Sequence, residues 1–214
     1  MPIRGVSLVN GEVYHVYNKS IANFKVFNND INYNRMIELM SYYITEDVPY
    51  SFSIYKSLKN VELNCLKHIV DIVAYCLMPT HIHFIMKQNR DNGIESFISL
   101  ISNSYSKYFN ALYARKGPLW EGRFKNVLVN NDEQLLHLTR YVHLNPVTAF
   151  LVNNPVDWKY SSYNEYMAAE ICENKLCHYN GLLNIDKTLY KKFVSDGIDY
   201  QRQLAIIKNV TIEG

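Results

Sequence analysis

Residues 69–87, IVDIVAYCLMPTHIHFIMK, decide the fold. Residues 69–77 and 81–87 are rich in β-branched side chains and interspersed aromatic ones, which is typical of strands. Between them, Met78-Pro79-Thr80 contains a proline that disfavours a continuous helix. We therefore expect two strands that flank a turn.

The segments on either side carry the remaining strand and helix patterns. Residues 12–18 (EVYHVYN) alternate and predict a first strand, and residues 124–129 predict a last, short one. Residues 31–44 have helical spacing after a capping Asp30. Residues 93–115 carry an apolar stripe at a spacing of three and four, which predicts a long amphipathic helix closed by Gly117-Pro118.

A further helix is expected over 133–144, capped by Asn131 or Asp132. Asn145-Pro146 should end it, because the residue before a proline is pushed out of the helical region. Weaker helical patterns cover 57–67, 158–170 and 185–193.

The predicted order is strand, helix, strand, strand, helix, strand, then a terminal helix. This order indicates an α+β, ferredoxin-like (split βαβ) fold, an antiparallel sheet with helices on one face, followed by a C-terminal helical extension. The 214 residues divide into a main domain over 1–165 and an extension of unknown role over 166–214.

Positive charge is local in this chain. The formal net charge is +2, yet residues 101–130 hold five Lys or Arg and one acid. Such a window is typical of a nucleic-acid contact, although a solvated helix face has the same composition. The basic residues are Lys107, Arg115, Lys116, Arg123 and Lys125.

The four cysteines, Cys65, Cys76, Cys172 and Cys177, show no C-x-x-C spacing, and we interpret them as reduced thiols. The first ten residues lack the apolar core of a signal peptide, and charged or polar residues interrupt every apolar run before it reaches the ~18 residues of a membrane helix. A soluble, cytoplasmic protein without membrane contact is expected.

His81 and His83 lie two apart on a predicted strand, so both imidazoles project from one face. They could therefore bind one divalent cation. Two neutral ligands leave the full charge of the metal to polarise a phosphate oxygen, which favours phosphoryl transfer. Two strand histidines that only pack and hydrogen-bond remain the alternative.

Tyr141 and Asn145 lie four apart and share one helix face. A phenol with a pKa of about 10 is a weak nucleophile at neutral pH, so a metal beside it would help, and the amide of Asn145 could supply a third, oxygen ligand. A buried aromatic role for Tyr141 remains open, and Tyr105 is the main competing nucleophile.

Three strings carry a resemblance: LMPTHIHFIM (77–86), GPLWEGRF (117–124) and RYVHLNP (140–146). With Tyr105 to Asn110, they resemble, in the same order, the motifs of the single-tyrosine HUH (IS200-like) transposases, and among these the REP-associated tyrosine transposases. The likeness covers roughly residues 10–165. Thr80 departs from the family pattern, which usually has Asn, Asp or Glu there, and the tail beyond about 170 matches no pattern.

The resemblance implies that His81 and His83 bind Mg²⁺ or Mn²⁺, that Tyr141 is the nucleophile and that Asn145 assists the metal. It also implies single-stranded or hairpin DNA as substrate, a 5′-phosphotyrosine intermediate, and a nucleoid-associated protein of a bacterial cell, either monomer or homodimer. For DNA contact we add Trp120 to the five basic residues above, since stacking of one base contributes ~1–3 kcal/mol. The alternative is that Trp120 closes the core beneath the helix.

Two rival functions stay open. One is a non-catalytic, ferredoxin-like nucleic-acid-binding protein, although the strand at 81–88 lacks the aromatic pattern of RNA-recognition modules. The other is a zinc site or metal hydrolase in which His137 or His143 joins the H-x-H pair.

Overall fold

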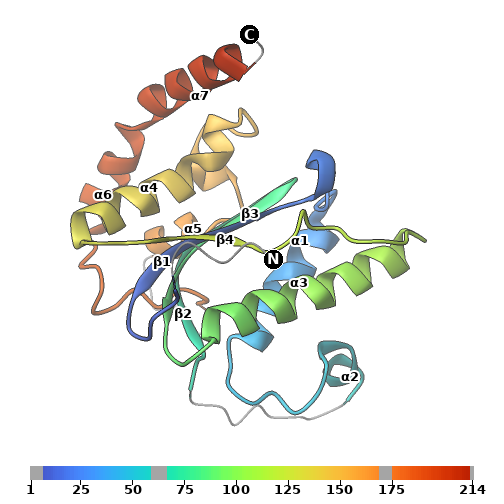
Figure 1. The fold of residues 1–214 in the computed structure, drawn as a ribbon. Helices are drawn as coiled ribbons and strands as arrows, with labels where there is room; N and C mark the ends of the chain where they lie inside the picture. Colours follow the sequence, from blue (N-terminus) through green and yellow to red (C-terminus); the bar gives the residue numbers. More distant parts are fainter. Residues whose placement is uncertain (1–6, 59–66, 169–174, 213–214) are drawn as a thin grey trace.

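The computed structural model describes residues 7–58, 67–168 and 175–212, with side chains as far as residue 206. Its centre is an antiparallel sheet of strand order β2-β3-β1-β4 (Figure 1). The predicted α+β, ferredoxin-like class is confirmed. The strands are β1 (Val13–Lys19), β2 (Val70–Met78), β3 (His81–Gln88) and β4 (Lys125–Leu128), and the α-helices are α1 (Asp30–Tyr43), α2 (Phe52–Ser57), α3 (Gly93–Leu112), α4 (Asp132–Thr148), α5 (Tyr163–Met167), α6 (Lys187–Ser195) and α7 (Ile198–Ile212), with short 3-10 turns at Ile21–Asn23 and Pro155–Asp157.

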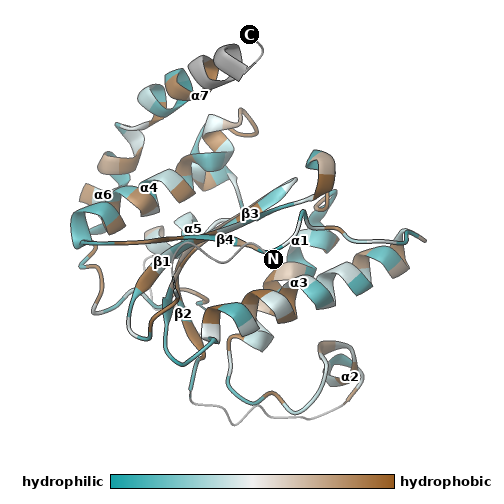
Figure 2. Ribbon diagram, in the orientation of Figure 1, coloured by the Kyte–Doolittle hydropathy of each residue, from teal (hydrophilic) through white to brown (hydrophobic). Residues whose placement is uncertain are grey.

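Helices cover both faces of the sheet (Figure 1). α1 and α3 pack on one face, where the alternate strand residues Val16 and Phe84 are fully buried. α4 packs on the other, where Val142 joins Cys76 and Ile85 in a second apolar cluster. The expected placement on one face therefore holds for α1 and α3, while α4 occupies the opposite face. Figure 2 shows hydrophobic residues along the strands between these two layers.

Asparagines cap two of the helices: Asn29 caps α1 in place of the expected Asp30, and Asn131, one of the two expected candidates, caps α4. Asn29 accepts a hydrogen bond from the Asn32 N–H (3.1 Å), so Asp30 is the first residue of α1 and not its cap. Asn131 caps α4 in the same way through the Gln134 N–H (2.8 Å). In both cases the side-chain oxygen satisfies an amide that the first turn leaves unpaired.

The prediction that α4 stops before Pro146 is wrong, because the helix continues to Thr148. Proline lacks the N–H that would bond the Val142 carbonyl. The side-chain nitrogen of Asn145 lies 3.5 Å from that carbonyl, and the Ala149 N–H resumes the ladder at the Asn145 carbonyl (2.9 Å). Val147 is 1% exposed, so burial of the last turn stabilises the continued helix.

Tyr166, Leu176, Cys177, Tyr190 and Val194, all beyond residue 165, are buried in the same core as α1 and α3. The expected short helices near 158–170 and 185–193 are α5 and α6, whereas α7 was not predicted. The weak helical pattern over 57–67 falls mostly outside the described residues, as do Cys65 and Cys172. The described part of the extension therefore packs against residues 7–165 and shares their core.

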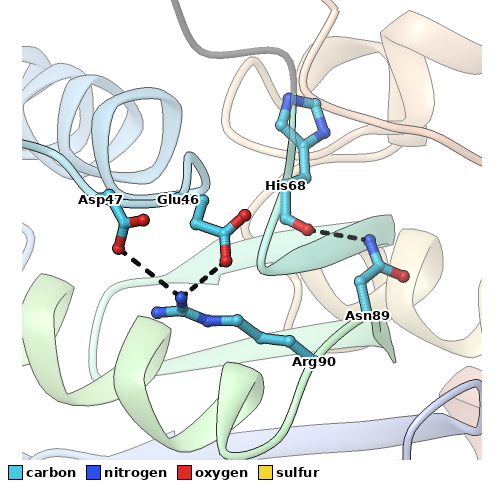
Figure 3. A network of polar contacts seen from close by, with 5 residues as sticks. All are labelled: Glu46, Asp47, His68, Asn89 and Arg90. Atoms are coloured by element: carbon cyan, nitrogen blue, oxygen red, sulfur yellow. Dashed lines mark hydrogen bonds and ion pairs between the residues drawn. The ribbon is translucent and has the colours of Figure 1, made fainter.

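A polar network ties the segment after α1 to the turn between β3 and α3 (Figure 3). The Arg90 guanidinium lies 2.9 Å from the Glu46 carboxylate and 3.8 Å from Asp47, and the Asn89 amide donates to the His68 carbonyl (3.3 Å). Because these ion pairs are partly exposed, each contributes only about 0–1 kcal/mol. Within the described chain, no helix is both long and apolar enough to cross a membrane.

Candidate active site

Side chains from β1 and β3 share the face of the sheet that α4 covers. In the antiparallel register, Tyr17 lies opposite His83 and Lys19 lies opposite His81. Alternate residues of a strand share a face, so His15 also lies beside the H-x-H pair. The ring centroids of His81 and His83 are 5.0 Å apart, and those of His15 and His83 are 5.4 Å apart.

Each of the two predicted metal ligands has one ring nitrogen held by a neighbour. Thr80 Oγ1 lies 3.0 Å from His81 Nδ1, and His15 Nε2 lies 3.1 Å from His83 Nδ1. Such partners orient metal-binding imidazoles and fix their tautomer. They leave Nε2 of each ring as the candidate metal-binding atom.

Burial keeps these imidazoles neutral. It lowers the pKa of His15 to about 4, and burial together with the charge of Lys19 lowers the pKa of His81 to about 4. The pKa of His83 is held well below its usual range by burial, by the two other histidines and by Lys19. Neutral imidazoles keep the lone pairs that a cation needs.

Tyr141 extends from α4 over the histidines. Its ring lies perpendicular to that of His83 with 5.8 Å between centroids, and 6.0 Å from that of His15. The side chain is 37% exposed. Burial and the nearby Tyr17 raise its pKa, while a hydrogen bond from Asn145 acts in the opposite direction. The phenol is therefore protonated at neutral pH and accessible from one side.

Asn145 lies one turn after Tyr141 on the same helix. Its side-chain nitrogen donates to the Tyr141 carbonyl (2.9 Å), which leaves the amide oxygen for another partner. Two imidazoles and one amide oxygen fit a cation completed by oxygens from elsewhere. Among the described residues, no three His, Cys, Asp or Glu side chains form a metal-binding group. Since imidazoles also suit Zn²⁺ and Fe²⁺, the choice of Mg²⁺ or Mn²⁺ depends on the oxygen ligands.

Known proteins are similar to this chain in sequence and in fold. Residues 52–145, which include both histidines, Tyr141 and Asn145, match the family described as Transposase IS200 like. A protein of Haemophilus influenzae, described as a REP-associated tyrosine transposase, is 27% identical over 139 residues, which make up 60% of this chain and 76% of that protein. The chain therefore resembles the IS200-like transposases over residues 52–145.

The fold of this chain agrees with a solved structure of a REP-associated tyrosine transposase bound to a REP hairpin. The TM-score is 0.56 at 15% identity, over 87% of this chain and 96% of that one. The family match supports a DNA transposase over a non-catalytic nucleic-acid-binding protein.

The rival candidate residues lie away from His81, His83 and Tyr141. Tyr105 is fully buried between α3 and the opposite face of the sheet, where its hydroxyl donates to the Val26 carbonyl. His137 pairs with Arg140, and His143, also on α4, is buried with Tyr190 and Ser162 as its partners. The expectation that His137 or His143 joins the H-x-H pair is therefore wrong.

Four of the six predicted DNA-contact residues lie in two different layers. Lys125 lies on the catalytic face, with its ammonium 6.0 Å from the centroid of the Tyr17 ring. Arg123 and Lys125 line a cavity of about 150 Å³ that Tyr17 and Lys19 also line. Lys107, on α3, and Lys116, just after it, are exposed but belong to the opposite layer.

Two of the predicted contacts have structural partners instead. Trp120 is 8% exposed and its ring nitrogen donates to the Ser102 carbonyl (3.3 Å), so the prediction that it stacks on a DNA base does not fit its burial. The Arg115 guanidinium donates to the Pro118 carbonyl (2.9 Å), to that of Gly117 and to Asn110, which closes the loop after α3.

The sequence did not predict His15, Tyr17 and Lys19 as residues of this site. Their alternation along β1 already places all three on one face. The sequence could not say that this face is also that of His81 and His83, because the register between β1 and β3 sets that relation.

Proposed function

We propose that this protein is a transposase that cuts and rejoins one DNA strand, with Tyr141 as the nucleophile. The observation that carries the proposal is the position of the Tyr141 ring over His83 and His15 of the same chain. His81 and His83 would hold Mg²⁺ or Mn²⁺, and the Asn145 oxygen would be a further ligand. All of these groups come from one chain, so a homodimer is not required to complete the site.

A divalent cation held there would polarise a phosphate oxygen and favour the phenolate form of the tyrosine. The chain itself supplies the nucleophile and its orientation. The Tyr141 oxygen forms a bond to phosphorus, the bond from phosphorus to the 3′ oxygen breaks, and that oxygen takes up a proton. The phenol proton leaves to solvent, and the 5′ end of the DNA stays attached to Tyr141 as a phosphotyrosine.

The phosphotyrosine conserves the phosphoester, so attack by a 3′ hydroxyl rejoins the strand without ATP. Tyr141 is then released and recovers its proton. The chemistry is therefore reversible transfer of a strand rather than hydrolysis, provided that water is kept from the adduct.

For the substrate we propose single-stranded or hairpin DNA. We further propose that the protein acts in the bacterial cytoplasm, at the nucleoid. The solved REP-associated transposase is bound to a REP hairpin, and this supports hairpin DNA as the substrate of the present protein. Lys19 and Lys125 supply positive charge on both sides of Tyr17, next to the histidines. Cations in that position suit the phosphates that flank the cleaved one.

The test is to incubate the full chain with labelled hairpin and single-stranded DNA and Mn²⁺ or Mg²⁺. A DNA–protein adduct is then mapped by mass spectrometry. We expect the adduct on Tyr141, lost in Tyr141→Phe and in His81→Ala, and retained in the matched control Tyr105→Phe. An adduct on Tyr17 would move the nucleophile to β1. Salt-dependent binding of DNA without an adduct would favour the non-catalytic protein.

A further inference from the structure

The side of α4 that faces away from the catalytic histidines is also fully packed. Residues two apart on a helix point about 200° apart, so Thr139 and His143 lie on the side opposite Tyr141. Both side chains are fully buried. α6, from the C-terminal extension, packs against this side of α4.

A chain of hydrogen bonds joins α6 to α4 and to the core. The Tyr190 hydroxyl lies 2.9 Å from Thr139 Oγ1 and 2.7 Å from His143 Nδ1. His143 Nε2 lies 2.8 Å from Ser162 Oγ. Thr139 donates onward to the Leu136 carbonyl (2.7 Å). A neutral His143 protonated on Nδ1 lets Tyr190 donate to Thr139 and Ser162 donate to His143 Nε2. The Tyr75 carbonyl, 3.2 Å from Ser162 Oγ, is the second acceptor within reach of that hydroxyl.

The residues next to Tyr141 along the helix also rest on the extension. The Arg140 guanidinium lies over the Phe193 ring, 4.2 Å from its centroid. At Gly197, between α6 and α7, a Cβ atom would come within 3.0 Å of Arg140 and 3.3 Å of Leu144. The turn between the two helices therefore approaches α4 as closely as glycine permits.

We propose that Tyr190 is a positioning residue for the Tyr141 nucleophile, and that the extension thereby serves catalysis. This inference rests on the proposed function. Apolar contacts between α4 and the sheet have no preferred direction, so they resist small rotations of the helix weakly. Hydrogen bonds to Thr139 and His143 are directional and fix the rotation of α4. Because Tyr141 projects from the opposite side, that rotation sets where its hydroxyl lies.

The experiment compares full-length wild type with Tyr190→Phe, which keeps the ring and removes the hydroxyl. We measure the single-turnover rate constant for adduct formation on a hairpin and, separately, the Kd for the same DNA. A misplacement of about 1 Å at a reacting group can cost about 100-fold in rate. We expect the rate constant to fall by roughly 10- to 100-fold, with the Kd changed less than about twofold. Leu189→Ala, at a neighbouring residue that is 69% exposed, is the matched control and should match wild type.

The amplitude of adduct formation separates positioning from folding. If Tyr190→Phe only lowers the folded fraction, the amplitude falls while the rate constant stays at the wild-type value, and the positioning role is overturned. A wild-type rate with full amplitude overturns it as well. If wild type itself forms no adduct on Tyr141, the proposed function fails first and the positioning role fails with it.

Discussion

Removal of the His15 imidazole should weaken metal binding at His83 without removing a proposed ligand. His15 Nε2 is the partner of His83 Nδ1 at 3.1 Å, and the two residues are 9% and 6% exposed. In His15→Ala the Nδ1 of His83 is left buried and unpaired, which costs about 1–3 kcal/mol. Loss of such a partner typically lowers the affinity of the histidine for its metal about 10- to 100-fold. The two ranges agree, since a tenfold change corresponds to about 1.4 kcal/mol.

The assay is the rate of adduct formation as a function of Mn²⁺ concentration. We expect the half-saturating Mn²⁺ concentration of His15→Ala to rise about 10- to 100-fold, while the rate at saturating Mn²⁺ stays within about threefold of wild type. His15→Gln is the matched control, because its side-chain oxygen can accept the hydrogen bond from His83 Nδ1 that Nε2 of His15 accepts in wild type. The reasoning is refuted if His15→Ala keeps the wild-type half-saturation, or if Gln and Ala behave alike.

Three further outcomes are expected. Gly93→Ala should lower the free energy of unfolding by about 1–3 kcal/mol in urea titrations, because the added Cβ would lie 2.3 Å from the Ile69 carbonyl oxygen. A higher free energy of unfolding, as expected when alanine replaces a glycine inside a helix without a clash, would contradict this contact. Burial lowers the pKa of His143 to about 3, so the stability that the neutral imidazole contributes above the unfolded pKa of about 6.5 is lost as pH falls. Between pH 7 and pH 5 the free energy of unfolding of wild type should therefore fall by about 2 kcal/mol more than that of His143→Gln. Equal losses in the two proteins would contradict a neutral, buried His143. Lys125→Met should weaken single-stranded DNA binding and reduce the slope of log Kd against log salt by about 0.7, whereas an unchanged slope would place Lys125 off the DNA path.

Local patterns predicted the elements of the fold well. The β-branched and aromatic residues of 69–87 predicted two strands within one residue of β2 and β3, and the apolar stripe of 93–115 predicted α3. These signals depend on residues close in the chain, since the periods of strand and helix are local properties. The H-x-H spacing and the four-residue spacing of Tyr141 and Asn145 are local in the same sense.

Errors appeared where packing between distant segments outweighs a local rule. Pro146 should end a helix, but burial of Val147 and the Asn145 side chain extend α4 past it. Trp120 has the chemistry to stack on a base, yet its ring is buried and bonded to Ser102. In each case the local preference amounts to a few kcal/mol, which buried contacts readily offset.

The sequence by itself determined the fold class and the candidate ligands and nucleophile, His81, His83, Tyr141 and Asn145, because each rests on short periodicities and motifs. Tertiary structure alone decided that Tyr141 lies over those histidines, that His15 supports His83, and that the extension holds the far side of α4. These relations depend on strand register and helix packing between residues some 50 to 130 positions apart. Contacts between residues so far apart along the chain are not encoded in a local pattern. They form when the apolar faces of distant elements pack against one another as the whole chain folds.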